Sequence, residues 1–401
     1  MNITLELLNE NNWYTITQLS VSEEQKEIFP VPNVYWIGSS RYEEKNELYA
    51  IKSDDEYVGL IGGGFDSNGV DGLIEPIMID QHYQGRGIAG QAIELMIKHL
   101  GIHLSITKVY IEHGRNNTAM KYILDKLGFK TFDEDDEGFR RYIDISNINE
   151  NESALYDDNF PRSNKYDFMW VLRDGMGPHP LWLTEFLVQP FKLKPGMRVL
   201  DLACGKGMTS VFLAREFGVQ VYAVDFDEWE GWTSTEIRWD NAIEYNVENL
   251  VIPIKADARN LPFAPGFFDA IICVDAYIYF GQEDDYLQNI LQFLRPGGKI
   301  GMIVPGYMKD VSTGVPEYIV EFLGDELWTW QTESWWKALW EKDDDISLDV
   351  VDTMPNGCDL WLRYDTAMQS SGLSQWPDET DLQRRDNGEY IGFIRMVATK
   401  N

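Results

Sequence analysis

One segment constrains the fold more than any other part of the chain. Residues 199–214 (VLDLACGKGMTSVFLA) read as a buried strand, a glycine-containing loop and an amphipathic helix in direct succession. In such a turn the small residues Ala203, Gly205 and Gly207 let the backbone approach a ligand closely, and they supply main-chain N–H groups at a helix start. The segment alone fits a nucleotide-binding loop of more than one kind.

The strands that follow narrow the choice. The next strand reads VYAVD and ends in Asp225, about 20 residues after Gly205, where a carboxylate can accept hydrogen bonds from ribose hydroxyls. After a third strand, VIPIKA, Asp257 places another carboxylate at the same sheet edge, where ligands bind in open α/β folds. Strands and helices alternate between residues 198 and 304, which predicts a parallel α/β sheet.

This ordered set resembles the class I S-adenosylmethionine-dependent methyltransferases, which have a Rossmann-like fold. The first family motif, DxGxGxG, is matched by Asp201, Ala203, Gly205 and Gly207, with Ala203 in place of the first glycine. Further matches are LPF at 261–263, FD at 268–269 and LRPGGK at 294–299. The resemblance implies that residues 203–207 hold the methionine end of S-adenosylmethionine. It also implies that Asp225 holds the ribose and Asp257 the adenine amino group, with Ala258 among the cofactor-binding residues.

A narrower resemblance is to the small-molecule methyltransferases grouped with cyclopropane fatty acid synthase-like enzymes. Residues 176–187 (MGPHPLWLTEFL) and 274–280 (VDAYIYF) carry it, and they would flank the methyl donor. Positioning dominates methyl transfer, and a base is needed only if the acceptor carries a proton. The candidate catalytic residues are His179, Asp275, Tyr277 and Tyr279. The alternatives are a helix-entry bond to backbone for His179 and core packing for the tyrosines.

Tryptophans are frequent near the carboxyl end, and aromatic faces attract onium groups such as an alkylammonium acceptor or a sulfonium. The residues are Trp328, Trp330, Trp335, Trp336, Trp340 and Trp361. The spacing of Trp336 and Trp340 is that of one helix face, so packing in a core or an aromatic lid is favoured over a cage.

Charge and cysteine content limit the partners. The net charge of −32 repels phosphate backbones and anionic membranes, so we expect neither nucleic acid nor a membrane as partner. It favours a small-molecule substrate, either a cationic amine or a neutral compound, although an acidic surface can serve solubility alone. The chain shows no secretory signal and no long apolar run, which predicts a cytoplasmic protein. Cys204, Cys273 and Cys358 form no CxxC pair, which predicts buried thiols and no metal site.

The amino-terminal half contains a second glycine-rich loop between a strand and a helix, within residues 76–100. Gly85, Gly87 and Gly90 match GxGxxG, with Glu112 about 20 residues on, but the three strands joined by short turns that precede the loop argue against a dinucleotide site. The better match is QxxGxA, which resembles the pyrophosphate loop of GCN5-related N-acetyltransferases. That resemblance implies a mixed-sheet α+β domain that binds acetyl-CoA through Gln84, Gly85, Arg86, Gly87, Ile88 and Ala89.

One position departs from that family. The family usually has a tyrosine, the acid for the departing thiolate, four residues before the glycine of GF, where this chain has Leu124. Tyr122 lies about 200° away around the helix and should face elsewhere. Glu75, on the strand before the loop, is a candidate base for an incoming amine or simply an exposed strand residue. Acetyl transfer by this domain is therefore left open.

The sequence predicts a fusion of two domains of different fold classes. A GCN5-related acetyltransferase-like domain occupies residues 1–147, a polar linker 148–164, and an α/β methyltransferase domain 165–401, which includes the aromatic-rich carboxyl-terminal region. The expected activity is methyl transfer from S-adenosylmethionine to a small molecule. The alternatives are a first domain that only senses acyl-CoA or recruits substrate, or an enzyme that modifies a protein. The sequence names no acceptor and no oligomeric state.

Overall fold

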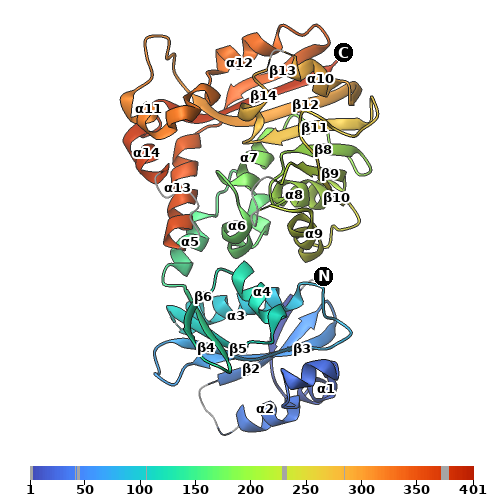
Figure 1. The fold of residues 1–401 in the computed structure, drawn as a ribbon, viewed down its shortest axis with the longest axis vertical. Coiled ribbons are helices and arrows are strands. Elements are labelled where there is room, and N and C mark those ends of the chain that lie inside the picture. The colour runs from blue at the N-terminus through green and yellow to red at the C-terminus, as the bar shows by residue number, and fades with distance from the viewer. Residues whose placement is uncertain are drawn as a thin grey trace. The chain divides into compact units, whose positions relative to one another are not determined.

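The computed structural model describes residues 3–40, 42, 46–104, 106–227, 233–283, 285–371 and 379–401. The chain divides into two compact units (Figure 1), the first formed mainly by Met1–Ser153 and the second mainly by Ala154–Gln369 and Ser374–Asn401. Within the described residues, no helix is long and apolar enough to cross a membrane.

The first unit is a seven-stranded mixed sheet in the order β1-β2-β3-β4-β5-β7-β6. Only the β4–β5 pair is parallel, and the other neighbouring strands are antiparallel. The strands are β1 (Ile3–Leu7), β2 (Asn46–Ser53), β3 (Glu56–Phe65), β4 (Gly72–Ile79), β5 (Lys108–Gly114), β6 (Lys130–Glu134) and β7 (Gly138–Asp144). The mixed α+β class predicted for this unit is confirmed.

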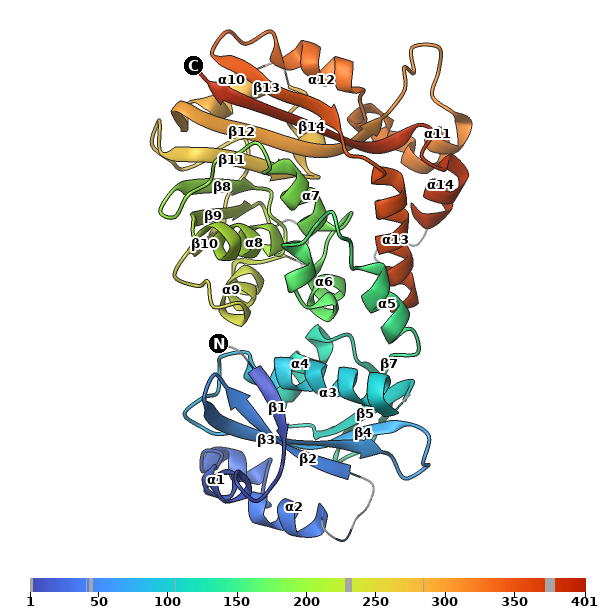
Figure 2. The same cartoon turned by 180° about the vertical axis from the view of Figure 1, so that it is seen from behind.

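Helices cover both faces of this sheet. Helices α1 (Trp13–Gln18) and α2 (Asn33–Ser40) lie on one face, and α3 (Ile88–Leu104) and α4 (Thr118–Lys126) on the other (Figures 1 and 2). A short 3-10 helix, η1 (Glu24–Glu27), precedes α2, and α5 (Ile148–Ala154) follows the last strand. The loop between the carboxyl end of β4 and the start of α3 contains Gln84, Gly85, Arg86 and Gly87. The N–H groups of these residues therefore lie at a helix start.

The second unit is also a seven-stranded sheet, in the order β10-β9-β8-β11-β12-β14-β13. Strands β8 to β12 pair in parallel, and β14 lies antiparallel between β12 and β13. The strands are β8 (Arg198–Leu202), β9 (Gln220–Asp225), β10 (Val251–Lys255), β11 (Phe268–Val274), β12 (Leu294–Tyr307), β13 (Ile346–Thr353) and β14 (Ile391–Lys400). The predicted parallel α/β core is confirmed.

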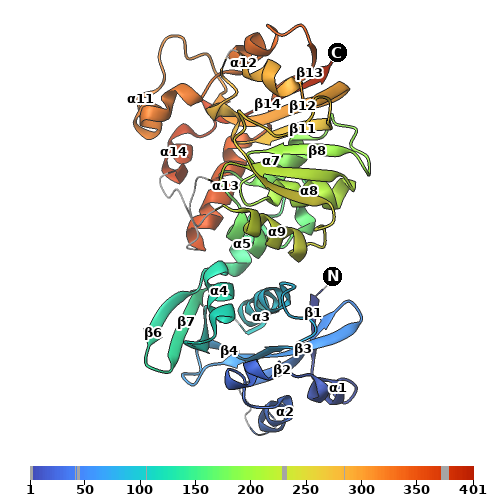
Figure 3. The same cartoon turned by 45° about the vertical axis from the view of Figure 1, so that its right-hand side comes forward.

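The helices of the second unit connect these strands. Helix α8 packs on β9, α9 on β10, and α12 on β13 and β14. Figure 3 labels these three helices in the second unit. The helices are α6 (Phe168–Asp174), α7 (Pro180–Leu187), α8 (Met208–Phe217), α9 (Thr235–Glu244), α10 (Tyr286–Leu291), α11 (Glu317–Leu323), α12 (Glu333–Trp340), α13 (Gly357–Ser370) and α14 (Glu379–Asp386), with 3-10 helices η2 (Ser163–Lys165), η3 (Tyr277–Tyr279) and η4 (Gly324–Thr329). Trp336 and Trp340 are fully buried, as core packing requires, whereas Trp328 is 55% exposed.

Candidate functional site

The loop between β8 and α8 has the backbone that its small residues predict. Ala203, Gly205 and Gly207 all have positive φ, at 56°, 54° and 81°. Glycine adopts this left-handed region freely, whereas a residue with a Cβ pays about 1–2 kcal/mol there. Ala203, which stands where the family motif has glycine, is therefore held in a strained conformation. A tight loop of this kind presents main-chain N–H groups at the start of α8.

Asp225 organises this loop from the end of β9. Its Oδ2 accepts a hydrogen bond from the Gly205 N–H at 2.8 Å, and its Oδ1 accepts one from the Asp227 N–H at 3.0 Å. Each carboxylate oxygen has a second lone pair, which can accept from a ligand hydroxyl. Asp225 therefore both fixes the loop and keeps an acceptor at the sheet edge.

Asp201 lies beneath the loop. It is 1% exposed, and its Oδ2 accepts the Ser210 hydroxyl at 2.6 Å. Burial and, to a smaller extent, the nearby Asp225 carboxylate raise the pKa of Asp201 to about 7. Its contact with Ser210 ties β8 to α8 and so supports the loop from below.

Two side chains of α9 hold the loop, and the sequence analysis missed both. Arg238 is fully buried, pairs with Asp227 at 2.7 and 3.1 Å, and donates to the Gly205 carbonyl at 3.2 Å. Asn241 donates to the Lys206 carbonyl at 3.0 Å. The only signal in the sequence is their i, i+3 spacing, which puts both on one helix face. That spacing alone does not distinguish a buried polar face from a solvated one.

Asp257 and Ala258 follow β10, the strand beside β9. Lys255 pairs with Asp225, so the loop after β10 starts at the same edge of the sheet. The Asp257 carboxylate is 42% exposed, and its Oδ1 accepts the Arg259 N–H at 2.8 Å. The Ala258 carbonyl accepts the Tyr286 hydroxyl at 3.1 Å. The structure thus places the predicted adenine and ribose residues on adjacent strands.

A group of three acidic residues lies at the end of β11. Asp275 directly follows this strand with φ of 67°, and burial together with Asp365 raises its pKa to about 7. Asp365 of α13 is buried, and burial raises its pKa. Glu379 of α14 is bonded to Asp365, and burial and the Asp365 charge raise its pKa. We call Asp275, Asp365 and Glu379 the acidic cluster.

One short segment connects the acidic cluster with the loop between β8 and α8, residues 203–207, which we call the cofactor loop. A Cβ atom built on Gly177 would collide with the Asp275 carboxylate, and one built on Gly205 would lie 3.0 Å from the Met176 sulfur. A Cβ atom on Gly175 would collide with the Tyr364 hydroxyl. That hydroxyl is buried and has no hydrogen-bond partner among the described residues. The unpaired Tyr364 hydroxyl and the Asp275 carboxylate therefore both lie against residues 175–177, the segment that contacts the cofactor loop.

The other catalytic candidates have different surroundings. His179 is buried and caps α7, where its Nδ1 accepts the Trp182 N–H at 3.3 Å. Burial lowers the pKa of His179 to about 3, so the ring is neutral. Tyr277 packs in the core against Trp336 and Trp340. Tyr279 is 48% exposed. Burial and the Asp275 charge raise its pKa, so it lies nearer the acidic cluster than Tyr277 does.

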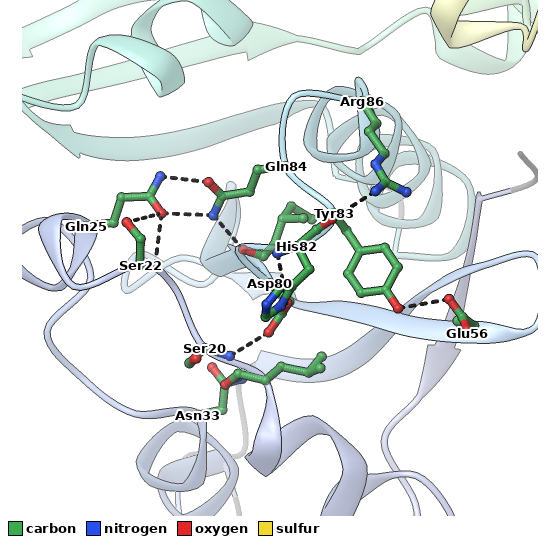
Figure 4. Close-up of polar contacts among 12 residues, drawn as sticks. Ser20, Ser22, Gln25, Asn33, Glu56, Asp80, His82, Tyr83, Gln84 and Arg86 are labelled. Atoms are coloured by element: carbon green, nitrogen blue, oxygen red, sulfur yellow. Dashed lines mark hydrogen bonds and ion pairs between the residues drawn. The ribbon is translucent and has the colours of Figure 1, made fainter.

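The QxxGxA loop of the first unit is braced by its glutamine (Figure 4). Gln84 donates to the Ile79 carbonyl at 2.8 Å and exchanges two hydrogen bonds of 2.9 Å with Gln25 of η1. Gly85 and Gly87 have φ of 74° and 75°, and space is open around both. Because its side-chain amide is engaged in these bonds, Gln84 positions the loop, and the main-chain N–H groups are the candidates for binding an anion.

The other predicted residues of the first unit can also be placed. Arg86 donates to the His82 carbonyl at 2.9 Å (Figure 4), and Ile88 and Ala89 form the first turn of α3. Glu75 is exposed on β4. On α4, Leu124 is fully buried and Tyr122 is 53% exposed, so Tyr122 faces away from the core as expected.

All three cysteines are buried free thiols. Within the described ranges, no group of side chains could hold a metal ion.

The folds and loops define a class of protein: a mixed-sheet unit with a pyrophosphate-type loop, joined to a Rossmann-like unit with a cofactor loop. Residues 11–129 match the family model of the acetyltransferase (GNAT) family, and residues 199–298 match that of a methyltransferase domain. The chain is therefore a fusion of a GNAT acetyltransferase domain and a methyltransferase domain, as the sequence predicted.

Several methyltransferases are similar to this chain. Methyltransferase GfsG of Streptomyces halstedii is 30% identical over 34% of this chain and 48% of its own length. Phosphoethanolamine N-methyltransferase 1 of Arabidopsis thaliana is 24% identical over 59% of this chain and 43% of its own. The chain thus spans about half the length of these curated relatives. Geranyl diphosphate C-methyltransferase of Streptomyces coelicolor A3(2) has 15% identity and a TM-score of 0.47, covering 62% of this chain and 86% of that one.

Proposed function

We propose that residues 165–401 transfer a methyl group from S-adenosylmethionine to a small molecule that carries a cationic amine. The observation that carries the proposal is the acidic cluster beside the cofactor loop. Burial raises the pKa of all three carboxyl groups, the Asp365 charge also raises those of Asp275 and Glu379, and no compensating cation is among their described contacts. An ammonium group placed between them would relieve both their repulsion and the cost of their burial.

The residues of the second unit fit S-adenosylmethionine. The left-handed loop at Ala203, Gly205 and Gly207 suits the methionine end, Asp225 the ribose and Asp257 the adenine amino group. Bound there, S-adenosylmethionine supplies an electrophilic methyl group on a sulfonium. Met176 touches Gly205, and Gly177 touches Asp275, so an acceptor at the acidic cluster would lie next to the methyl donor.

The acidic cluster can also take up the proton that the acceptor must lose. An ammonium nitrogen has no lone pair, so it must release a proton before it forms a bond to carbon. Asp275, with a pKa raised to about 7, is suited to accept that proton near neutral pH. Tyr279 and the unpaired Tyr364 hydroxyl are the other groups placed to contact the acceptor.

Methylation assays with matched acceptors test this proposal. Primary, secondary and tertiary amines are compared with neutral alcohols of the same shape, with labelled S-adenosylmethionine as donor. Glu379→Gln should raise KM for the amine by roughly 10- to 100-fold, the scale of losing a hydrogen bond to a charged group, and should keep the affinity for S-adenosylmethionine. The control is Asp381→Asn on the same helix, because the Asp381 side chain is 82% exposed. Equal turnover of the neutral alcohols would contradict the amine assignment.

We further propose that residues 1–147 bind acetyl-CoA, with residues 148–164 as the connection between the two domains. The supporting observation is the open, left-handed Gly85–Gly87 loop at the start of α3, because such a loop can hold the pyrophosphate on its N–H groups. Calorimetry of the full chain with acetyl-CoA tests it. An absence of binding would leave the first unit without its proposed ligand.

A further inference from the structure

The sheet of the first unit opens between β4 and β5. Only Gly72 and Leu73 pair with Val109 and Tyr110, although β4 continues to Ile79 and β5 to Gly114. The strands therefore diverge toward the end at which β4 leads into the QxxGxA loop. A ligand whose phosphates lie on that loop can extend its amide-bearing arm into the opening and pair with a strand edge.

His113 lies on the β5 side of this opening, three residues beyond the last pair. Continuing the pairing by three residues in both strands would bring it opposite Pro76, next to Glu75. His113 shares a sheet face with Ile111, and Ile111 pairs with Arg141. Arg141 binds Asp125 of α4, so this is the face that α4 covers. The same helix carries Leu124, at the position where a proton donor is missing.

The hydrogen bonds of His113 define its tautomer. The ring is 8% exposed, and its Nδ1 lies 3.1 Å from the Gly114 carbonyl oxygen. A carbonyl can only accept, so Nδ1 carries the proton and Nε2 presents a bare lone pair. Nε2 is buried and has no partner among the described residues. A buried acceptor left unpaired destabilises the protein, so a bound donor at this point would be stabilising.

Charged groups from two neighbouring elements face this ring. Arg141 comes from β7, and Lys121 and Asp125 come from α4. Burial is the largest effect and lowers the pKa of His113, which keeps the imidazole neutral near pH 7. The ring also packs against Phe139, 5.3 Å between centroids. His113 Nε2 is therefore unprotonated near pH 7 and can accept a hydrogen bond.

We propose that His113 carries the proton in acyl transfer from acetyl-CoA to an amine, a role that rests on the proposed binding of acetyl-CoA. The amine nitrogen bonds to the thioester carbon, and its proton passes to Nε2. The C–S bond then breaks, the sulfur keeps the electron pair, and the imidazolium returns the proton to it. The products are an amide and the free thiol of coenzyme A, and no further reactant is needed. His113 thereby replaces the tyrosine that is absent at Leu124.

Thiol release by the full chain tests this role, with acetyl-CoA as donor and spermidine, spermine and simple amines as acceptors. His113→Gln should slow amine-dependent thiol release by about 10²- to 10⁴-fold at saturating acetyl-CoA. Its affinity for acetyl-CoA should change by less than about twofold. Adding Leu124→Tyr to His113→Gln should restore part of the rate, which a merely structural role would not predict. Tyr122→Phe, on the exposed face of α4, is the control.

Two results would overturn the role of His113: an unchanged rate in His113→Gln, or a parent protein that binds acetyl-CoA but releases no thiol with any of the amines. A parent that binds no acetyl-CoA would instead remove the proposed ligand of the first unit. If His113→Gln does not fold, nitrogen NMR of the parent decides. The His113 Nε2 resonance should shift when acetyl-CoA is added, and a resonance that stays in place while acetyl-CoA binds would contradict the proposal.

Discussion

Asp201 is a buried and Asp275 a partly buried carboxyl group, each at the end of a central strand, but their partners differ. The Asp201 carboxyl is bonded to Ser210, which fixes the turn between β8 and α8. The Asp275 carboxyl lies against Gly177, which has no side chain to pair with it, and faces a second acidic residue, Asp365. Asp201 therefore stabilises the fold, whereas Asp275 is the carboxyl group that we expect to exchange a proton with a ligand.

Asp275→Asn should change the pH dependence of stability. The folded-state pKa of Asp275, about 7, lies above its ordinary value of 3.8, so the folded protein keeps a proton that the unfolded chain releases. Stability should therefore fall as pH rises from about 4 to about 7, by at most about 1.4 kcal/mol per pH unit. Asn carries no charge and tolerates positive φ. We expect a higher melting temperature than the parent at pH 8 and little difference at pH 4.

The control for this prediction is the exposed Asp381→Asn, which should leave the pH profile of the melting temperature unchanged. A profile for Asp275→Asn that runs parallel to that of the parent at every pH would show that Asp275 is ionised at little cost. In that case it could not serve as the acceptor of a proton near neutral pH.

The predicted cofactor-binding residues that the structure brings together lie in segments with strict backbone demands. Gly205, Gly207 and Asp225 come together because a tight turn and a strand end dictate their positions. Partners from other elements could not be predicted. Arg238 reaches the loop from α9, and Asp365 reaches Asp275 from α13. Nothing in a single sequence specifies which distant helix faces a given loop.

Helix α9 acts as the outer support of the cofactor loop. Ser234 caps its start by accepting the Ile237 N–H at 3.2 Å, and its buried face carries Arg238 and Asn241. The guanidinium of Arg238 binds both oxygens of Asp227 and the Gly205 carbonyl, and a Cβ on Gly207 would lie 3.0 Å from its side chain. Planar bidentate pairing of this kind suits Arg and not Lys.

Arg238→Met should destabilise the protein and weaken S-adenosylmethionine binding. It leaves the buried Asp227 carboxylate without its partner, which typically costs about 3–5 kcal/mol. Urea unfolding measures the stability, and calorimetry measures the binding. Adding Asp227→Asn to Arg238→Met removes the stranded charge and should recover part of the stability. A double variant as unstable as Arg238→Met alone would show that the cost lies in lost packing.

Elements with strong periodicity were predictable, and their neighbours across the sheet were not. The alternating strands of the second unit and the three-strand meander of the first unit were recovered from apolar patterns. The insertion of β14 between β12 and β13 depends on pairing with segments that lie 84–100 and 41–54 residues earlier in the chain. The apolar sequence pattern of neither β4 nor β5 indicates that the two strands diverge. Both features are set by tertiary pairing.

At the scale of the whole molecule, the chain carries two separate candidate sites for cofactors of different chemistry. The loop of the first unit suits a pyrophosphate anion, and its open glycines accept no side chain without strain. The loop of the second unit is closed by a carboxylate, which suits ribose hydroxyls and would repel a phosphate. We therefore expect each loop to select its own ligand.

This difference predicts that a substitution in one loop changes the melting shift caused by one ligand and leaves the shift caused by the other ligand unchanged. Coenzyme A and S-adenosylhomocysteine, each at about 100 times its Kd, should each stabilise the unit that binds it by about 2.7 kcal/mol. Gly87→Asp puts a negative charge in the first loop and should abolish only the coenzyme A shift. Gly87→Asn is its matched control, because Asn tolerates the φ of 75° without the charge. Asp225→Ala removes a hydrogen-bonding carboxylate, worth roughly 1.5–3 kcal/mol, and should reduce only the S-adenosylhomocysteine shift. If Gly87→Asp also removed the S-adenosylhomocysteine shift, the two sites would not be independent.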